Sequence, residues 1–585
     1  MIRALRHRKI LSSILIGAVF LIAVFLAFGH SLTQGFAPVD DLFLIVENLA
    51  IRGITWENLK HVFTTYDPEL YVPLVFVSFQ LNWLMSGLEP FGYHLTNILL
   101  HVINALLVAR ILFQLSGEKW LSIFAGLLFA VHPLHTEAVV WLAGRKDLLS
   151  GTFFFAALTF YLDSVKGSKR AYILSIIFFA LALLSKVIAV TLFGVIVLHL
   201  LLIERRRFTK PVIVSLIPYT FLSFVFMIVA MGGKGRVVAA VSSWDKVLVA
   251  CKSTIFYLQK LLVPTDLTII YPLQGDISLW STDILPYAIL SLLLVVVALR
   301  SWRRHPWLTF GIGWYLATLA PTYLNIGKAG LVFFAVDRYA YLPSVGILFL
   351  LVCFASATMH QCRLFNYSNF RMKDIMTAVA GGAVLIALIF LSQTQTRTWD
   401  TPDGLFQRTL EIYPESIGAR VGLSTIYRHQ NKLEEAFEVL REGLKYGEHS
   451  LLELYVGYVY AKAGQVSDAK DRFLSASQMD PINPEPLFAL GSLYEKTGEP
   501  GRAIPLYEQA IALDDSYVIV RARLGLLYLD EGREEEAREQ FEAALKWNIN
   551  SYEANLGMVE LLKKEQKTQE ALKYQEKVDK LTMDN

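Results

Sequence analysis

Two adjacent carboxylic acids, Asp40 and Asp41, follow the first long apolar stretch of the chain, which ends near Gly29. A carboxylate within hydrogen-bond reach of a nucleophile can take its proton, which contributes about 10² to 10⁴ in rate. Neighbouring side chains point in different directions, so one acid can face a substrate while the other holds the backbone. The competing interpretation is that the pair only caps a helix beginning at Leu42, where acids favour the N-terminal dipole.

A second group of candidate residues lies in the segment FAVHPLHTEAVVWLAGRKDLL (129–149), between two apolar runs. Ionisable groups at membrane depth cost about 2.5 to 3.5 kcal/mol each on insertion scales, so such a cluster indicates a functional site. Arg145 offers a planar fork of donors and Lys146 a compact charge, and both suit a phosphate. The competing interpretation is that both residues only reach out to the membrane surface.

The same segment contains His132, His135 and Glu137, whose spacing could bind a metal. Pro133 breaks the helix that would align the two imidazoles. We therefore expect a hydrogen-bonded polar cluster. A divalent metal is disfavoured, and no cofactor is assigned.

Two further apolar stretches carry polar residues. In GYHLTNILLHVINALL (92–107), His94, Asn97 and His101 lie at i, i+3 and i+7, on one face of a helix. Such a stripe must face protein or a cavity, either as part of a site or as ordinary interhelical hydrogen bonding. In AVDRYAYLPSVG (335–346), Arg338 precedes an apolar run and is a third candidate ligand for an anion.

The elements that position these residues are expected to be membrane helices. The chain has 585 residues, of which 54% are hydrophobic, and a mean hydropathy of +0.45, too apolar for a soluble enzyme of this size. Apolar runs of about 17 to 22 residues recur, the length that crosses ~30 Å of hydrocarbon as a helix. The expected spans are about 10–29, 93–114, 120–137, 147–163, 171–186, 187–203, 211–231, 284–299, 307–324, 340–358 and 375–393.

Basic residues set the expected orientation. Four of them between positions 3 and 9 precede the first span, which places the N-terminus in the cytoplasm. Alternation then leaves the clusters VKGSKR, ERRRF, RSWRRH and RLFNYSNFRMK inside, provided that 246–263 is a re-entrant or interfacial helix outside. The segments that then share the outer face are the loop with the two acids, residues 132–147, residues 232–283, the segment before Arg338 and the soluble tail.

The tail repeats with a period of 34 residues. Segments 450–483 and 484–517 and the residues after them return the same types at matching positions: Gly457, Gly491 and Gly525; Tyr460, Tyr494 and Tyr528; Gly464, Gly498 and Gly532; Ala469, Ala503 and Ala537; Phe473, Tyr507 and Phe541. This pattern is typical of tetratricopeptide repeats, in which small residues let two helices pack closely and aromatic rings fill the gap. Such arrays form a groove that holds an extended peptide or a partner protein. A spacer or a dimerisation module is the alternative.

These patterns predict an all-α chain. Residues 1–395 form a polytopic transmembrane domain of about 11 spans, 396–416 a linker, and 417–585 an extracytoplasmic α-solenoid of about four to five repeats. The three cysteines are too few and too scattered for a disulfide framework or a zinc site. The basic excess of the membrane part is a topology signal, so no nucleic-acid partner is expected, and no glycine-rich phosphate loop is present.

Several stretches together resemble the transmembrane and tetratricopeptide-repeat family of O-mannosyltransferase-like proteins, within the C-type class of membrane glycosyltransferases. They are VDD after the first span, GYHLTNILLH, LLFAVHPLHTEAVVWLAGRKDLL, DRYAYLPSVG and the repeat tail. The resemblance implies transfer of a sugar, usually mannose, from a polyprenyl-phosphate carrier to Ser or Thr hydroxyls of proteins on the outer side of the membrane. It also implies an essential acidic pair, for which we favour Asp40 as base and Asp41 as partner, although the roles could be exchanged.

The chemistry that this resemblance implies is a displacement at the anomeric carbon of an already activated sugar. Arg145, Lys146 and Arg338 would then stabilise the departing phosphate, and a single displacement would invert the anomeric configuration. The chain departs from the family at YVPL (71–74), where Tyr-Arg-Pro-Leu is common, and at Lys186-Val187, where Lys-Glu is common. Both departures bear on the donor and on binding of its carrier.

The short cytoplasmic loops resemble a bacterial member, with undecaprenyl phosphate as carrier, an inner-membrane location and a periplasmic tail. In a eukaryotic member the membrane would be that of the endoplasmic reticulum and the tail luminal. Three alternatives remain: a non-catalytic membrane-anchored scaffold for secreted proteins, a transferase acting on lipid or glycan acceptors, and a transporter. Transport is disfavoured because no pair of broken helices marks a site at the membrane midplane.

Overall fold

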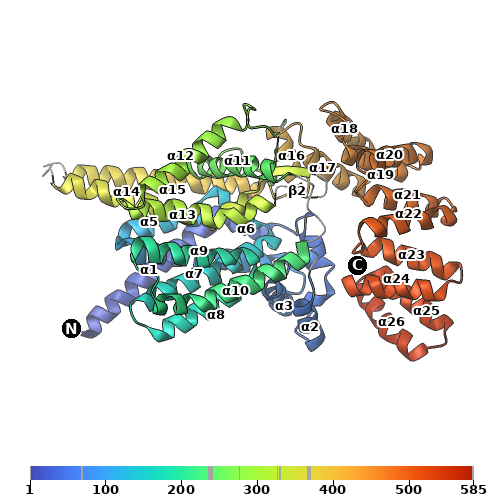
Figure 1. The fold of residues 1–585 in the computed structure, drawn as a ribbon, viewed down its shortest axis with the longest axis horizontal. Coiled ribbons are helices and arrows are strands. Elements are labelled where there is room, and N and C mark those ends of the chain that lie inside the picture. Colours follow the sequence, from blue (N-terminus) through green and yellow to red (C-terminus); the bar gives the residue numbers. More distant parts are fainter. Residues whose placement is uncertain are drawn as a thin grey trace. The chain divides into compact units, whose positions relative to one another are not determined.

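The computed structural model describes residues 2–66, 70–234, 242–273, 275, 277–325, 327–328, 331–364 and 370–582. These residues are mostly helical, which confirms the all-α prediction (Figure 1). The chain divides into two compact units, Met1–Val46 with Ala50–Leu405, and Glu47–Leu49 with Phe406–Asn585. Parts of two segments discussed above, 365–369 of the cluster RLFNYSNFRMK and 235–241, 274 and 276 of the 232–283 loop, lie outside the described residues.

The first unit is built from long helices joined by short turns. Its α-helices are α1 (Ile2–Phe28), α2 (Trp56–Thr64), α3 (Pro73–Ser86), α4 (Pro90–Ser116), α5 (Lys119–Val131), α6 (Thr136–Val140), α7 (Arg145–Val165), α8 (Lys169–Ser185), α9 (Thr191–Leu198), α10 (Lys210–Lys234), α11 (Ser243–Leu262), α12 (Leu285–Ser301), α13 (Pro306–Leu319), α14 (Ser344–Leu364) and α15 (Phe370–Arg397). The short 3-10 or π turns between them are η1 (Gly29–Thr33), η2 (Leu42–Val46), η3 (Leu49–Ile51), η4 (Pro133–His135), η5 (Leu142–Gly144), η6 (Val187–Val190), η7 (His199–Ile203), η8 (Ala320–Leu324) and η9 (Asp337–Ala340).

A small antiparallel sheet lies between α11 and α14 in the sequence. Its strands are β1 (Tyr271–Pro272), β2 (Gly327–Lys328) and β3 (Leu331–Ala335), in the order β1-β3-β2. Tyr271 pairs with Ala335, just before η9, so the sheet holds the segment that carries Arg338.

Among the described residues, five helices are long and apolar enough to cross a membrane. They are Leu11–Thr33, Pro90–Ser116, Leu142–Val165, Lys210–Gly232 and Met376–Arg397. The pair Lys119–Val131 and Pro133–Val140, bent by 54°, would make a sixth, and Val187–Ile203, Leu285–Ser301 and Ser344–Met359 are shorter apolar helices. The membrane character of the unit is therefore confirmed, whereas the number of eleven spans remains a prediction.

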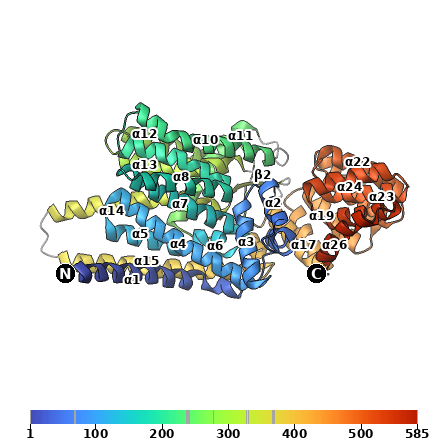
Figure 2. The same ribbon diagram turned by 90° about the horizontal axis from the view of Figure 1, so that it is seen from below.

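The helices pack closely where small residues allow it. A side chain at Gly126 of α5 would approach Ala109 of α4 to 2.6 Å, and one at Gly346 of α14 would approach the Gly311 carbonyl of α13 to 2.6 Å. Contacts of this kind are typical of membrane helices, which gain their association from close packing. Figure 2 shows α15 running alongside α1, and both pack against α5.

The region between α5 and α7 is broken twice. Residues before proline disfavour the helical conformation, so α5 ends at Val131, and the His132 ring accepts a hydrogen bond from the Leu134 amide (3.2 Å) at the start of the next turn. Gly144 closes the second turn, where an added side chain would lie 2.8 Å from the Ala138 carbonyl oxygen. Residues 132–144 therefore form a buried, compact group of short turns. The straight helix of the expected span 120–137 ends at Val131.

The expected interfacial stretch 246–263 is helix α11. Its Ser242 cap accepts a hydrogen bond from the Asp245 amide (3.0 Å). Of the three lysines that suggested a polar surface, Lys252 is buried and pairs with Asp283. The lysines therefore do not form one exposed face, and the position of α11 at a membrane surface remains a prediction.

The described part of the second unit consists of helical hairpins. Its helices are α16 (Gly404–Ile412), which begins just before the unit boundary, α17 (Ile417–His429), α18 (Leu433–Leu444), α19 (Ser450–Lys462), α20 (Val466–Met479), α21 (Glu485–Lys496), α22 (Pro500–Leu513), α23 (Val518–Asp530), α24 (Glu534–Trp547), α25 (Tyr552–Lys564) and α26 (Thr568–Thr582).

The repeated residues have the roles that their types predict. A side chain at Gly491 would lie 2.5 Å from the Tyr507 ring, and Gly457 and Gly525 meet the equivalent phenylalanines in the same way. The second repeated glycine takes a positive φ in each turn, as at Gly498 (+80°), a conformation that other residues rarely adopt. The three hairpins α19–α20, α21–α22 and α23–α24 thus close on a glycine-to-ring contact and a left-handed glycine turn. The turns of α17–α18 and α25–α26 instead place Asn431 and Gln566 at positive φ.

Candidate active site

Asp41 is buried in the loop that follows α1. One of its carboxylate oxygens accepts a hydrogen bond from the Ala143 amide (2.8 Å) and the other from the Ala37 amide (2.9 Å). Burial raises the pKa of Asp41 to about 7, although both backbone hydrogen bonds oppose that rise. Asp41 therefore ties the first loop to the turn before α7. The turn η2 does begin at Leu42, as the helix-cap interpretation expects, but the hydrogen bonds of the Asp41 carboxylate go to the Ala37 and Ala143 amides.

Asp40 faces the other way. Its side chain is 40% exposed, and its Oδ2 lies 3.7 Å from the Nζ of Lys146. The adjacent acids thus occupy opposite environments, one buried and bonded to backbone, the other open to solvent and next to a cation.

Arg145 and Lys146 also diverge, because consecutive residues on a helix point about 100° apart. Arg145 is fully buried and donates to the Asn97 side chain (2.8 Å), the Tyr93 carbonyl (2.7 Å) and the Asn82 side chain. Its guanidinium also stacks 4.7 Å from the ring of Phe79 on α3. Arg145 therefore holds α7 against α3 and α4, and Lys146 is the member of the pair that reaches Asp40.

Trp141 brings two cations together. Lys146 Nζ lies 4.6 Å from the centre of its ring and the Arg338 guanidinium 5.0 Å. The indole N–H is buried and has no hydrogen-bond partner among the described residues. A buried donor on a ring that two cations contact suits a ligand with negatively charged oxygens.

Arg338 is anchored by Glu137. Its main-chain amide donates to one carboxylate oxygen (2.8 Å), and its guanidinium pairs with the other. These two contacts fix η9 against α6, so the segment around residue 338 is held to the short turns of residues 132–144.

A third cation, Lys186, enters from the end of α8. Its Nζ donates to Asp147 Oδ1 (2.6 Å) and lies 5.8 Å from the ring centre of Tyr339. The guanidinium of Arg338 lies 5.3 Å from the centre of the same ring. Three cations from three separate segments thus gather around two aromatic rings, and each has one carboxylate partner: Lys146 with Asp40, Arg338 with Glu137, and Lys186 with Asp147.

Comparisons with known proteins agree with the pattern of the sequence. The tetratricopeptide repeat family model matches residues 457–518 and 488–551. A human protein named protein O-mannosyl-transferase TMTC3 is 34% identical over 199 residues, which make up 32% of this chain and 21% of that protein. A Xenopus laevis protein named protein O-mannosyl-transferase tmtc2 is 46% identical over 105 residues, or 18% of this chain and 12% of its own. The predicted resemblance to the transmembrane and tetratricopeptide-repeat family is confirmed.

The matches cover only part of each relative. The chain spans about a fifth of the length of the human protein and less of the Xenopus protein. Among solved structures, the tetratricopeptide-repeat protein YrrB, described as having an unusual peptide-binding site, covers 31% of this chain and 93% of its own, with 22% identity and a TM-score of 0.25.

The histidines of the predicted polar cluster are buried and bonded mainly to the main chain. His101 accepts from or donates to the Tyr341 hydroxyl (2.8 Å) and bonds the Ala130 carbonyl (3.1 Å). His132 bonds the Leu261 carbonyl (3.1 Å), and His135 bonds the Phe129 carbonyl (2.9 Å). The contacts of His132 and His135 join the short turns of residues 132–144 to α11 and α5, and those of His101 join α4 to α5 and to the segment after η9.

His94 differs from the other histidines, because its Nε2 lies 3.4 Å from the Gly35 carbonyl and its Nδ1 has no partner among the described residues. The described residues contain no group of three or more histidine, cysteine or acidic side chains able to hold a metal ion. Glu137, the third residue of the His-x-x-His-x-Glu spacing, is engaged with Arg338.

Four members of the cluster were not selected from the sequence as site residues: Trp141, Tyr339, Lys186 and Asp147. Trp141 lies inside the quoted polar segment, but a tryptophan near a membrane is most often an interface anchor. Lys186 lies at the break between two apolar runs, and an ionisable residue between two expected membrane spans was the signal that the sequence offered.

Proposed function

We propose that the chain is an integral-membrane glycosyltransferase. It moves a sugar, mannose or another hexose, from a polyprenyl-phosphate carrier to Ser or Thr hydroxyls of proteins on the outer face of the membrane. The observation that carries this proposal is the position of Asp40, a partly exposed carboxylate 3.7 Å from Lys146, which shares the Trp141 ring with Arg338. A base next to clustered cations is what displacement of a phosphate from an anomeric carbon requires.

The proposed reaction is a single displacement. The acceptor hydroxyl oxygen bonds to the anomeric carbon while the bond from that carbon to the phosphate oxygen breaks. The hydroxyl proton goes to Asp40, and the bonding electron pair leaves with the lipid phosphate. Lys146, Arg338 and the Trp141 N–H stabilise the negative charge that grows on this phosphate, and attack from the opposite side inverts the anomeric configuration.

Asp41 and Arg145 act as positioning residues in this account. Asp41 holds the loop of Asp40 to the Ala143 amide, one turn before Lys146. Arg145, whose donors are directed to Asn82, Asn97 and Tyr93, fixes the start of α7. These contacts support the proposal of a donor-phosphate site made by Lys146 and Arg338 with Lys186 nearby, and of an indirect role for Arg145.

The names of the relatives support transfer to proteins, and the repeat tail supports capture of a polypeptide, since such arrays hold extended peptides. We propose that this tail lies outside the cytoplasm and presents the acceptor, with the N-terminus inside as the basic residues predict.

The test of this function uses the full-length chain in liposomes with a Ser- and Thr-rich protein acceptor. The donor is mannosyl-phosphoryl-polyprenol in one sample and a nucleotide-linked mannose in the other. We expect transfer from the lipid donor alone, and an anomeric configuration in the product opposite to that of the donor, read by NMR. Transfer from the nucleotide donor or retention of configuration would contradict the mechanism, and binding of proteins without any transfer would favour the scaffold.

A further inference from the structure

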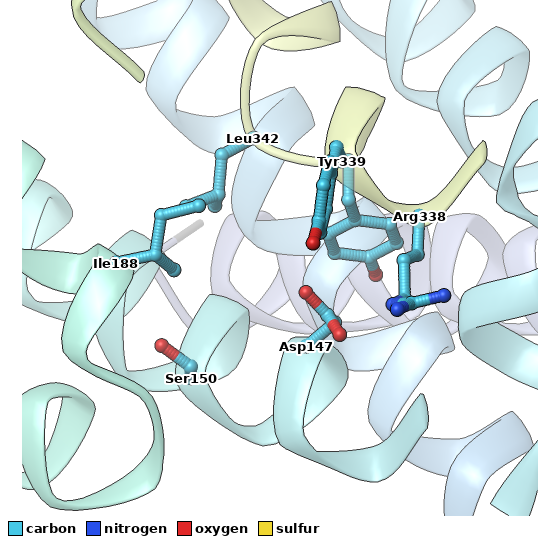
Figure 3. Close-up of a pocket in the computed structure, with 7 residues that line it drawn as sticks. Asp147, Ser150, Ile188, Arg338, Tyr339 and Leu342 are labelled. Carbon is cyan, nitrogen blue, oxygen red and sulfur yellow. The ribbon is translucent and has the colours of Figure 1, made fainter. Parts of the chain in front are cut away.

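A small pocket lies directly beside the cation cluster. Figure 3 shows Asp147 of α7, Arg338 and Tyr339 of η9, and Ile188 of η6 around the same space. Its free volume of about 10 Å³ is close to the least that one water-sized group requires. The residues that line it are Asp147, Ser150, Ile188, Arg338, Tyr339, Tyr341 and Leu342.

Two buried polar atoms of the residues that line this pocket have no hydrogen-bond partner among the described residues. One is Asp147 Oδ2, whose side chain is only 6% exposed and whose other oxygen is bonded to Lys186. The other is the Nε of Arg338, whose guanidinium is bonded elsewhere to Glu137. Buried polar groups in folded proteins are nearly always paired, because they have given up their bonds to water. These two atoms therefore point to a missing polar ligand.

The chemistry of the two atoms selects the kind of ligand. Asp147 Oδ2 accepts a hydrogen bond, and Arg338 Nε donates one, so the matching group must both donate and accept. A hydroxyl does both. A phosphate oxygen only accepts and would meet the negative charge of Asp147, and a metal or ammonium ion would meet the positive charges of Arg338 and Lys186.

We propose that this pocket is the subsite for one hydroxyl group of the donor sugar, and that Asp147 is a specificity-determining residue. The inference rests on the proposed function, because Arg338 then contacts the carrier phosphate on one side and the sugar hydroxyl on the other. The size of the pocket admits one hydroxyl oxygen and excludes a larger substituent at that carbon, such as an acetamido group.

The experiment compares the parent chain with Asp147→Asn in liposomes, using mannosyl-phosphoryl-polyprenol and its monodeoxy analogues, each lacking one hydroxyl. We expect Asp147→Asn to lower kcat/KM about 10- to 100-fold for the complete sugar and for every analogue that keeps the critical hydroxyl. For the one analogue that lacks it, parent and variant should perform equally. Ser150→Ala, which alters another residue that lines the pocket, is the matched control. It should change kcat/KM by the same factor for every analogue.

The outcomes separate this inference from the proposed function. An equal loss for all analogues would show that Asp147 only positions Lys186 or that the pocket holds a water, and would overturn the subsite alone. No transfer by the parent chain from any of these donors would overturn the proposed function and the subsite with it. Melting temperatures of both variants within a few degrees of the parent would show that the kinetic comparison concerns folded protein.

Discussion

At the proposed site, the two members of each adjacent pair of charged residues have different surroundings. Asp41 is buried against two backbone amides while Asp40 is open and near Lys146, and Arg145 is buried against Asn97 while Lys146 faces the loop. Because the two members of each pair differ in surroundings, substitutions of neighbours are expected to have different consequences.

Stability should depend on pH through Asp41. Its pKa is about 7 in the folded chain against an ordinary 3.8, so the folded state binds the proton more tightly. The stabilisation by this group is fully present below about pH 4 and is lost as the pH rises through 7, by up to about 4 kcal/mol. In detergent, the melting temperature of Asp41→Asn relative to the parent should therefore increase between pH 5 and pH 8.

The control for this measurement is Asp40→Asn, because this variant keeps the Asp41 carboxyl group and its two backbone hydrogen bonds. Its melting temperature should follow that of the parent across the same range. A constant difference between Asp41→Asn and the parent at every pH would show that Asp41 does not titrate in this way.

Arg145→Gln and Lys146→Gln should separate folding from transfer. Arg145→Gln leaves the Asn97 and Asn82 side chains and the Tyr93 carbonyl without their donor, at a cost of about 1 to 3 kcal/mol for each. We expect this variant to aggregate or to melt well below the parent. Lys146→Gln should elute and melt like the parent but lose at least about tenfold in sugar transfer, as expected when a cation for the leaving group is removed.

Gel filtration and transfer assays of the two proteins measure these effects. An Arg145→Gln protein that is as stable as the parent and fails only in transfer would place Arg145 at the phosphate instead.

The sequence predicted a chemical role for these residues but not the directions of their side chains. It placed Arg145 and Lys146 together as phosphate ligands because both are cations in a polar segment. Which of them reaches the site depends on Asn82, Asn97 and Tyr93, which come from other helices and only meet Arg145 in the folded chain. Side-chain direction of this kind requires the tertiary contacts.

At the scale of helices, two breaks in the helical chain shape the proposed site. Pro133 ends α5 as its chemistry predicts, and Gly144 allows the following turn to fold back onto the Ala138 carbonyl. The two breaks hold charged residues in a compact group of short turns between two apolar helices. A continuous helix through residues 132–144 would point Glu137 and Trp141 in directions set by its periodicity alone.

The repeat hairpins allow a matched test of packing. At Gly491 an added methyl group would lie 2.5 Å from the Tyr507 ring, whereas nothing lies within 4 Å of one at Gly501. Gly491→Ala should lower the stability of the tail by about 1 to 3 kcal/mol through overpacking. Gly501→Ala should leave it equal or raise it by up to about 1 kcal/mol, because alanine restricts the unfolded chain.

Both changes are measured by unfolding the full chain in urea, with protease cleavage within residues 417–585 as the readout of unfolding of the tail. Equal resistance of the two variants would contradict the close contact of α21 with α22.

At the scale of the whole molecule, the two units differed in how far the sequence could predict them. The repeat tail could be predicted because its contacts recur at a fixed period, as in the three glycine-to-ring contacts. The membrane site combines contacts between residues far apart in the chain, such as Asp41 with Ala143 and Glu137 with Arg338. Basic residues and composition indicated which segments belong together, but not that Lys186 and Trp141 complete the cluster.

Removal of residues 417–585 should separate the proposed capture of the acceptor from chemistry at the donor. Without the tail, transfer to protein acceptors should fall at least about tenfold, because the acceptor loses its local concentration at the site. Hydrolysis of the lipid-linked sugar by water should be nearly unchanged and serves as the internal control in the same sample. An equal loss of both activities would argue against a separate role of the tail in binding the acceptor.

The central claim, that Asp40 is the base of a sugar transfer, is tested most directly by Asp40→Asn in full-length chain reconstituted with mannosyl-phosphoryl-polyprenol and a protein acceptor. We expect the transfer rate to fall by about 10² to 10⁴ while the melting temperature stays at that of the parent. Asp245→Asn, a change of the same kind in the first turn of α11, should keep the parent rate. A folded Asp40→Asn protein that transfers sugar as fast as the parent would contradict this account.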